Sequence, residues 1–392
     1  MKDNQAKYPQ LRFKGFTDPW EERKLGEEAQ LTMGQSPNSE NYTENPDDYI
    51  LVQGNADMKN GRVVPRVWTT QVTKKAEKSD LILSVRAPVG DIGKTDYDVV
   101  LGRGVAAIKG NEFIFQQLGK MKLTGYWTRY STGSTFESIN SNDIKDAKIM
   151  VPVEEEQQKI GSFFKQLDHL ITLHQRKLDL LKEQKKGYLQ KMFPKNGAKV
   201  PELRFAGFAD DWEERKLGDI FSERNERANS GQYKMLSITV DSGIVPADSL
   251  DRKDNSSSDK SHYKRVFEGD IAYNSMRMWQ GASGVSEMNG IVSPAYTVLK
   301  PSKQTDTKFI SYLFKLTPML QSFQKNSQGL TSDTWNLKYK QFSPIKVKIP
   351  ILNEQMKIGK VLEMLDDSIA ANQRKLEKLQ ELKKVYLQKM FV

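Results

Sequence analysis

Two pairs of repeated segments constrain this chain more strongly than any other feature of its sequence. Residues 9–27 and 201–219 are identical at 14 of 19 positions. Residues 152–193 and 350–391 are identical at 23 of 42 positions, and both end in YLQKMF. Internal repeats at a nearly fixed offset indicate a repeated architecture. The 392 residues are therefore a tandem duplication of one unit.

Between the repeats lie two bodies, residues 28–150 and 220–349, which share little sequence. Both show the same order of segments: an acid, an apolar strand and an arginine, then a second strand and a helix-like stretch. The scaffold segments have stayed alike while the bodies have diverged. We expect two bodies with a common α/β fold and different surfaces, suited to the same task on two targets.

The longer repeat predicts two long helices with a coiled-coil seam. From Ile160, and again from Ile358, apolar residues alternate at spacings of four and three over four heptads. The predicted seam consists of Ile160, Phe164, Leu167, Ile171, His174, Leu178 and Leu181 in the first helix, and Ile358, Leu362, Leu365, Ile369, Asn372, Leu376 and Leu379 in the second. We interpret the polar pair His174 and Asn372 as residues that fix the register, because His174 has no metal-ligating partner nearby in sequence.

The order of the repeats predicts how the chain connects. Residues 201–219 follow the first helix, so equivalent placement puts residues 9–27 near the end of the second helix. The expected fold class is α+β: two α/β bodies joined by two long antiparallel coiled-coil helices in a pseudo-two-fold cyclic arrangement. The predicted boundaries are 1–151 and 195–349 for the bodies with their repeat segments, and 152–194 and 350–392 for the helices.

Composition and motifs argue against several classes of protein. With no cysteine, disulfide frameworks, cysteine-based zinc sites and thiol nucleophiles are excluded, and only three histidines remain. No catalytic or nucleotide-binding motif is complete, so we expect no enzyme site, no metal and no cofactor on this chain. No apolar run is long enough to span a membrane, and residues 1–10 are polar, so we expect a cytoplasmic protein with no membrane partner.

The duplicated WEERKLG and QRKL…YLQKMF segments, with the Asp80…Arg86 and Asp270 strand starts, resemble the specificity subunit of type I restriction–modification enzymes. The resemblance implies that each body is a target recognition domain reading one half of a split double-stranded DNA sequence. The helices would act as a spacer and dock two modification subunits, which restriction subunits join. S-adenosylmethionine, ATP and magnesium would be bound by those partner subunits.

The net charge of +10 is shared unevenly, with about none on the first body and +6 on the second. DNA contacts must therefore come from local faces, through basic, amide and hydroxyl side chains in loops. The candidates in the first body are Lys74, Lys75, Arg86, Arg103, Arg129, Tyr130, Ser131, Thr132 and Ser134. In the second body they are Lys264, Arg265, Asn274, Arg277, Trp279, Gln280, Lys325, Gln328, Thr331 and Lys338.

Some corresponding residues have a second interpretation. Arg86 and Arg277 are expected to correspond, either as phosphate contacts or as parts of the fold. Trp20 and Trp212 are interpreted as structural residues. Two other functions stay open at this stage: a free-standing bivalent DNA-binding regulator or scaffold, and an enzyme whose site the sequence does not reveal.

Overall fold

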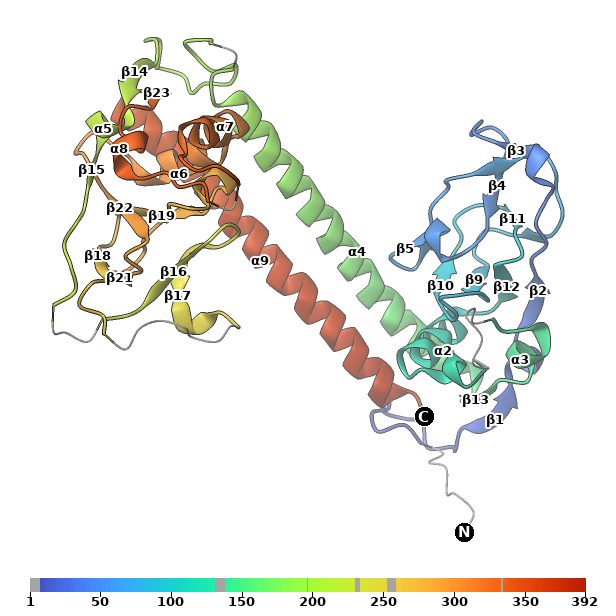
Figure 1. The fold of residues 1–392 in the computed structure, drawn as a ribbon. Coiled ribbons are helices and arrows are strands. Elements are labelled where there is room, and N and C mark those ends of the chain that lie inside the picture. The colour runs from blue at the N-terminus through green and yellow to red at the C-terminus, as the bar shows by residue number, and fades with distance from the viewer. Residues whose placement is uncertain (1–7, 131–137, 196, 230–232, 252–258, 333) are drawn as a thin grey trace. The chain divides into compact units, whose positions relative to one another are not determined.

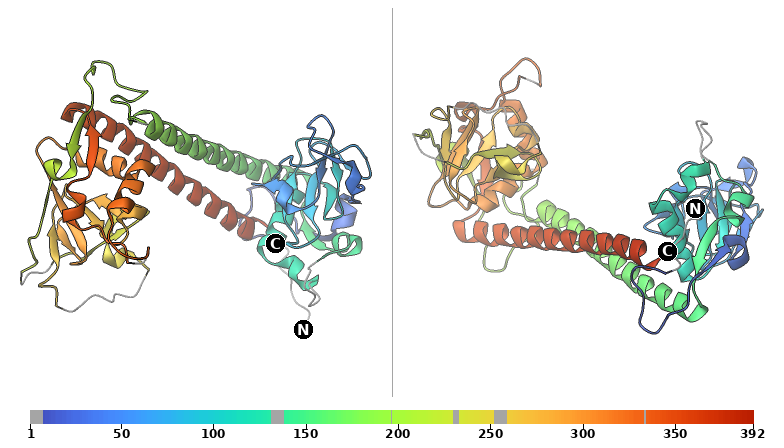
Figure 2. Two further views of the ribbon diagram at one scale, coloured as in Figure 1. Left: turned by 45° about the horizontal axis from the view of Figure 1, so that its top comes forward. Right: turned by 90° about the horizontal axis from the view of Figure 1, so that it is seen from below.

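The computed structural model describes residues 8–130, 138–195, 197–229, 233–251, 259–332 and 334–392. The chain forms two compact units, which Figures 1 and 2 show from different sides. Unit 1 comprises Met1–Lys177 and Asn372–Val392, and unit 2 comprises Leu178–Ala371. Both long helices, α4 (Glu154–Lys191) and α9 (Leu352–Met390), contribute residues to both units.

The body of unit 1 contains a six-stranded sheet in the order β2-β12-β9-β10-β6-β5 and a five-stranded sheet in the order β3-β7-β4-β11-β8. The strands are β1 (Glu21–Lys24), β2 (Gln30–Met33), β3 (Tyr42–Thr43), β4 (Tyr49–Val52), β5 (Met58–Lys59), β6 (Arg62–Val63), β7 (Trp68–Thr69), β8 (Lys75–Ala76), β9 (Leu81–Ser84), β10 (Ile92–Lys94), β11 (Val99–Leu101), β12 (Val105–Lys109) and β13 (Lys148–Val151). The helices of this body are α1 (Leu25–Glu28), α2 (Glu112–Leu123) and α3 (Ser141–Lys145), with η1 (Ser39–Asn41), η2 (Asn55–Asp57) and η3 (Tyr126–Tyr130).

The body of unit 2 contains a four-stranded sheet in the order β15-β22-β19-β20 and smaller two-stranded sheets. The strands are β14 (Glu213–Lys216), β15 (Phe221–Glu223), β16 (Leu236–Thr239), β17 (Gly243–Pro246), β18 (Lys264–Val266), β19 (Ile271–Asn274), β20 (Ser283–Val285), β21 (Gly290–Val292), β22 (Tyr296–Pro301) and β23 (Lys346–Ile349). The helices are α5 (Leu217–Ile220), α6 (Thr307–Lys315), α7 (Thr317–Asn326) and α8 (Tyr339–Phe342), with η4 (Ala247–Ser249) and η5 (Met278–Gln280).

Four strands in each body have the same arrangement. The order β2-β12-β9-β10 in unit 1 matches β15-β22-β19-β20 in unit 2, with antiparallel pairing throughout. A buried aspartate precedes each central strand, and its carboxylate accepts a backbone N–H three residues upstream: Asp80 from Glu77 and Asp270 from Phe267, both at 2.9 Å. The bodies therefore share a core topology, as the sequence predicts, and differ in the strands around it.

The core of each unit includes three aromatic rings that come from distant parts of the chain. In unit 1, Trp20 meets Phe113 at 5.7 Å and Phe391 at 6.3 Å between ring centroids, and the two phenylalanines stack at 5.0 Å. The twin cluster in unit 2 consists of Trp212, Phe309 and Phe193. Phe391 follows α9 whereas Phe193 follows α4, so the two helices exchange roles between the units.

The repeat segments attach to the helix ends in the same way. The N–H of Leu11 donates to the carbonyl of Lys389 at 2.9 Å, and the N–H of Leu203 donates to that of Lys191 at 2.8 Å. The C-terminus accordingly lies in unit 1 in every view of Figures 1 and 2. The predicted placement of residues 9–27 beside the end of the second helix is confirmed.

A buried ion pair joins each repeat segment to the start of the other long helix in its unit. The Arg12 guanidinium donates to both carboxylate oxygens of Glu156 at 2.8 and 2.7 Å. Arg204 binds Glu354 in the same way, with both distances 2.8 Å. The hydrogen bond to Glu156 raises the pKa of Arg12, so its guanidinium stays charged. Glu156, at the start of α4, thus has a partner 144 residues away in the sequence.

Within each unit the segments of α4 and α9 run antiparallel. In unit 1, Asp168 pairs with Lys383 at 2.6 Å, and six residues later on α4 His174 meets Asn372 at 2.7 Å. In unit 2, Lys185 pairs with Asp366. All fourteen predicted seam residues are buried or half-buried. The mixed α and β class and the long helices agree with the predicted fold.

Candidate nucleic-acid interface

In both units, two loops meet just beyond the central strand. The N–H of Ile139 donates to the Val85 carbonyl at 3.0 Å, and the N–H of Leu337 donates to the Ser275 carbonyl at 2.8 Å. Val85 follows β9 and Ser275 follows β19 directly. The loop after the central strand and the segment that leads to the last strand of the body therefore form one surface in each unit.

In unit 2, an aromatic contact ties these two loops together. The rings of Trp279 and Trp335 meet edge to face at 5.2 Å, and the Trp279 Nε1–H donates to the Met276 carbonyl at 3.1 Å. Trp335 was not among the residues predicted from the sequence, although its place in a polar loop is a signal that could have identified it. The surface brings together the predicted residues Asn274 at the end of β19, Arg277, Trp279 and Gln280 from the first loop, and Gln328, Thr331 and Lys338 from the second.

The loop surface of unit 2 offers the groups that contact nucleic acids. Arg277 and Gln280 are exposed, and within the described part of the chain the Arg277 guanidinium has no hydrogen bond or ion pair. Lys325, near the end of α7, is also exposed. A free guanidinium, amides and an aromatic ring can bind phosphate, base edges and base faces respectively.

Two predicted residues of unit 2 belong to a different environment. Lys264 and Arg265 lie on β18, where they form ion pairs with Glu223 at 3.3 Å and Glu226 at 3.2 Å. The Arg265 guanidinium also lies over the ring of Phe267 at 4.6 Å. The structure therefore places these two cations in ion pairs within the body, rather than on the loop surface.

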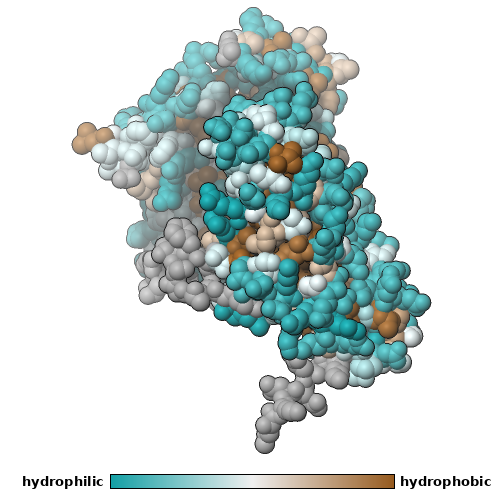
Figure 3. Space-filling view, turned by 90° about the vertical axis from the view of Figure 1, so that its right-hand side faces the viewer, coloured by the Kyte–Doolittle hydropathy of each residue, from teal (hydrophilic) through white to brown (hydrophobic). Residues whose placement is uncertain are grey.

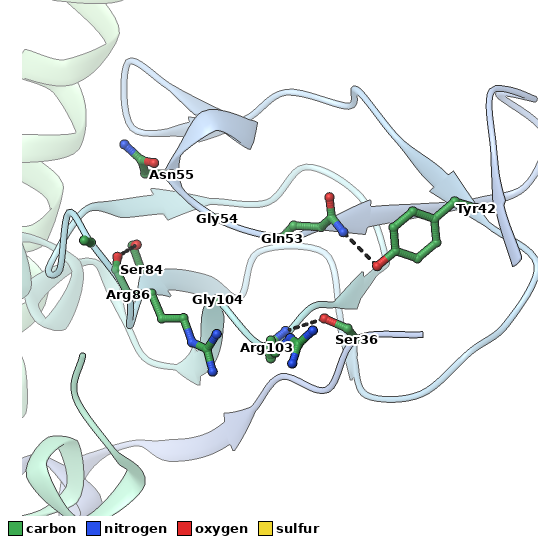
Figure 4. A pocket seen from close by; sticks show the side chains of 10 residues that line it. Ser36, Tyr42, Gln53, Gly54, Asn55, Ser84, Arg86, Arg103 and Gly104 are labelled. Atoms are coloured by element: carbon green, nitrogen blue, oxygen red, sulfur yellow. Dashed lines mark hydrogen bonds between the residues drawn. The ribbon is translucent and has the colours of Figure 1, made fainter. Parts of the chain in front are cut away.

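In unit 1 a polar cleft of about 340 Å³ adjoins the loop after β9 (Figure 4). It contains the predicted residues Arg86 and Arg103, both exposed, and neither guanidinium has a hydrogen bond or ion pair to any described residue. The other residues of the cleft were not predicted from the sequence, and their side chains include three hydroxyl groups and two amides. The remaining lining residues are Ser36, Tyr42, Gln53, Gly54, Asn55, Ser84, Ala87 and Gly104.

Two glycines hold the loop of Arg103 close to the neighbouring backbone. A Cβ atom on Gly104 would lie 2.1 Å from the Gln53 carbonyl oxygen, and one on Gly102 would lie 3.1 Å from the Gln53 Cα. The N–H of Arg103 donates to the Ser36 hydroxyl at 3.1 Å. The Gly-Arg-Gly sequence therefore forms a tight turn that presents one guanidinium to the cleft.

Arg86 and Arg277 were expected to occupy equivalent positions, but in the structure they differ by one residue. Counted from Asp80 and Asp270, which occupy equivalent places, Arg86 matches Met276 and Arg277 lies one residue further on. The local structures also differ, because Arg86 forms an isolated β-bridge with Ser138, whereas Arg277 precedes the short helix η5. The two bodies present their arginines on differently shaped loops.

The other candidates of unit 1 are dispersed. Lys74 and Lys75 are exposed at the edge strand β8, where the Lys75 Nζ lies 5.1 Å from the centre of the Tyr49 ring. Arg129 in η3 lies 3.8 Å over the Tyr126 ring and donates to its carbonyl. Tyr130 is the last residue of η3. Ser131, Thr132 and Ser134 lie outside the described residues.

The described residues contain no group of three or more His, Asp or Glu side chains that could hold a metal ion. None of the helices in the described ranges is long and apolar enough to cross a membrane. The face shown in Figure 3 is mostly hydrophilic, with small separate hydrophobic patches.

Comparison with known proteins gives a consistent assignment. A family model described as "Type I restriction modification DNA specificity domain" matches residues 17–183 and 209–381. Over 177 residues the chain is 32% identical to a protein of Methanocaldococcus jannaschii assigned as the MjaX type I restriction enzyme specificity subunit, with 43% of this chain and 41% of that protein covered. The MjaVIII specificity subunit of the same organism is 22% identical over 280 residues, which cover 64% of this chain and 63% of that subunit. The matches thus span less than two thirds of either relative.

A solved structure has the same fold. The S subunit of a type I restriction–modification system from M. genitalium superposes with a TM-score of 0.69 at 17% sequence identity. The superposition covers 98% of this chain and 99% of that one. At this identity the likeness concerns the fold, and it confirms the predicted architecture.

Proposed function

The chain belongs to the family of type I restriction–modification DNA specificity domains and carries two copies of that domain, and from this premise we propose that it recognises a bipartite DNA target. Each body reads one half-site, and the long helices set the gap between the half-sites. The chain is the non-catalytic specificity subunit of a complex that modifies and restricts DNA.

One observation carries this proposal: an equivalent scaffold supports two different reading surfaces. The ion pairs Arg12–Glu156 and Arg204–Glu354 and the aromatic clusters repeat between the units. The loops beyond β9 and β19 differ in length, charge and residue type. A protein that reads two unlike half-sites with one framework needs this combination.

The helices support a partner-docking role. Both copies of the QRKL sequence expose an arginine and a lysine, Arg176 with Lys177 and Arg374 with Lys375, and the described residues provide no ion-pair partner for any of the four. Identical exposed cations on both helices suit the docking of two identical modification subunits. Restriction subunits then join through that complex.

The cofactors of the reaction belong to the partners. S-adenosylmethionine serves methyl transfer to adenine on the modification subunits, and ATP with magnesium serves the restriction subunits. The complex works on cellular DNA in the cytoplasm. This chain contributes the DNA sequence preference and sets the gap between the two half-sites.

Sequencing of methylated adenines in the host genome, with and without this gene, tests the proposal. We expect deletion to remove methylation at one split motif and to leave other methylated motifs unchanged. Restoring the gene on a plasmid must restore that motif. An unchanged methylome after deletion, with the modification subunit still expressed, would contradict the proposal.

A further inference from the structure

The cleft of unit 1 contains two amide side chains whose orientation is set by neighbours. Gln53 Nε2 donates to the Tyr42 hydroxyl at 2.9 Å, and Asn55 Nδ2 donates to an Asp91 carboxylate oxygen at 3.3 Å. Each contact uses one amide hydrogen and leaves the amide oxygen and the second N–H available. Those two groups are the pair that an amide side chain presents to a base edge in the major groove.

The support for Asn55 extends into helix α2. Asp91, which receives the Asn55 amide, also forms an ion pair with Lys122. Side chains that are held by a second layer of polar contacts keep one geometry before a ligand arrives. The cleft is therefore organised around polar groups that stay available.

The position of Arg103 is also fixed before a ligand binds, in this case by contacts of the backbone around it. Its turn is closed by the N–H of Val105 donating to the Gly102 carbonyl at 3.2 Å, and the close approach of both glycines to Gln53 limits movement. Two other arginines of the same body use their guanidinium groups internally: Arg62 binds Asp96, and Arg66 binds the Ala56 carbonyl. Figure 4 shows the Arg103 and Arg86 side chains extending toward the same side of the cleft.

We propose that this cleft is the base-reading site of unit 1 and that Arg103 reads a guanine. An unpaired guanidinium fork matches the O6 and N7 acceptors of guanine, which is the commonest specific contact between a side chain and a base. Gln53 and Asn55 read neighbouring base edges, and Arg86 supplies a second cation. The proposal rests on the proposed function and adds the chemistry of one half-site.

Unit 2 has no arginine in the position that corresponds to Arg103. The loop between β21 and β22, which corresponds to the loop of Arg103, contains Ser293, Pro294 and Ala295 and has no guanidinium. The effect of changing Arg103 is therefore confined to the half-site that unit 1 reads.

Selection from a pool of randomised double-stranded DNA tests the proposal. The full chain, assembled with its modification subunits, is compared as wild type, Arg103→Lys and Arg103→Ala. Because one bidentate contact discriminates by about 1–3 kcal/mol, we expect the preference for guanine at one position to fall roughly 5- to 150-fold in Arg103→Ala, and to fall less far in Arg103→Lys, whose ammonium can still donate to guanine. Arg103→Lys keeps the charge and loses the fork, so its binding must keep the salt dependence of the wild type.

Controls separate this proposal from the one on which it rests. Arg62→Ala removes an exposed arginine of the same unit that is ion-paired outside the cleft, and it must select the wild-type motif. If Arg103→Ala selects the unchanged motif, whatever its affinity, Arg103 does not read a base and the proposal is wrong. If the wild-type complex selects no split motif, the proposed function itself fails. Equal thermal unfolding of all variants shows that the fold is retained.

Discussion

His174 and Asn372 form two hydrogen bonds with each other across the seam between the long helices. The Asn372 Nδ2 donates to the His174 carbonyl at 2.8 Å, which turns its Oδ1 toward the imidazole Nδ1 at 2.7 Å. This geometry requires Nδ1 to carry a proton. The two residues hold equivalent positions of the repeat, and a polar pair in an apolar seam disfavours other registers.

Replacing one member of this pair tests its role. Asn372→Leu leaves the Nδ1–H of His174 without its partner, and we expect unfolding in urea to become easier by about 1–3 kcal/mol. The double variant His174→Leu/Asn372→Leu restores apolar contact and must lose less than the two single variants combined. The exposed Lys378→Leu serves as control. An Asn372→Leu protein as stable as the wild type would contradict this role.

The buried ion pairs predict equal effects in the two units. Arg12→Leu leaves the fully buried Glu156 without a counter-charge, so we expect a loss of about 3–5 kcal/mol in the free energy of unfolding. Arg204→Leu must cost a similar amount through Glu354. Arg23→Leu breaks an exposed pair on the same repeat segment and should change stability little. Equal stabilities of Arg12→Leu and Arg23→Leu would refute the account of this pair.

The burial of Lys315 should make the stability of the protein depend on pH. Burial lowers the pKa of its ammonium group, whose Nζ donates to the Val240 carbonyl at 3.0 Å. The folded chain therefore releases this proton at a lower pH than the unfolded chain, which retains it up to about 10.5. In that interval the unfolded state binds more protons, so stability rises with pH.

The variant Lys315→Met isolates this contribution. As the pH rises toward 10.5, the wild type should gain stability relative to the variant, measured by urea unfolding at a series of pH values. Lys340→Met, which replaces an exposed lysine, controls for the loss of a charge. Wild-type and Lys315→Met curves that stay parallel over the whole range would show that the burial of Lys315 has no such effect.

The spacer role predicts the effect of lengthening the helices. Seven residues inserted after Lys177, together with seven before Asn372, preserve the heptad phase and add roughly 10 Å of helix. We expect the gap in the methylated motif to grow by about three base pairs while both half-sites stay the same. Insertion into one helix alone misaligns the seam and should destabilise the protein. A paired insertion that leaves the gap unchanged would count against the spacer role.

Much of the fold could be predicted because the same structural pattern occurs in both copies of the duplicated unit. The seam and the equivalence of Trp20 with Trp212 follow from residues that recur at fixed offsets. The ion pair of Glu156 with Arg12 was not foreseen, because nothing local links an acid at a helix start to an arginine 144 residues away. The outer strands of the bodies differ between the copies, so the repeats carry no information about them.

The candidate interface was harder to predict, for physical reasons. Lys264 and Arg265 look like phosphate ligands in sequence, but their partners Glu223 and Glu226 come from a segment about 40 residues upstream. Gln53 and Asn55 are ordinary loop amides until the fold places them beside Arg103. The glycines around Arg103 were the available signal, because two glycines flanking one arginine indicate a close backbone approach.

A body exchange followed by methylome sequencing tests most directly whether each body reads one half-site. Residues 28–150 are replaced by the corresponding body of another specificity subunit, and both repeat segments and both helices are kept. We predict a new motif in which one half-site comes from the donor protein, while the other half-site and the gap are unchanged. A motif in which both halves change, or neither does, with the chimera folded and bound to its modification subunits, would contradict the account.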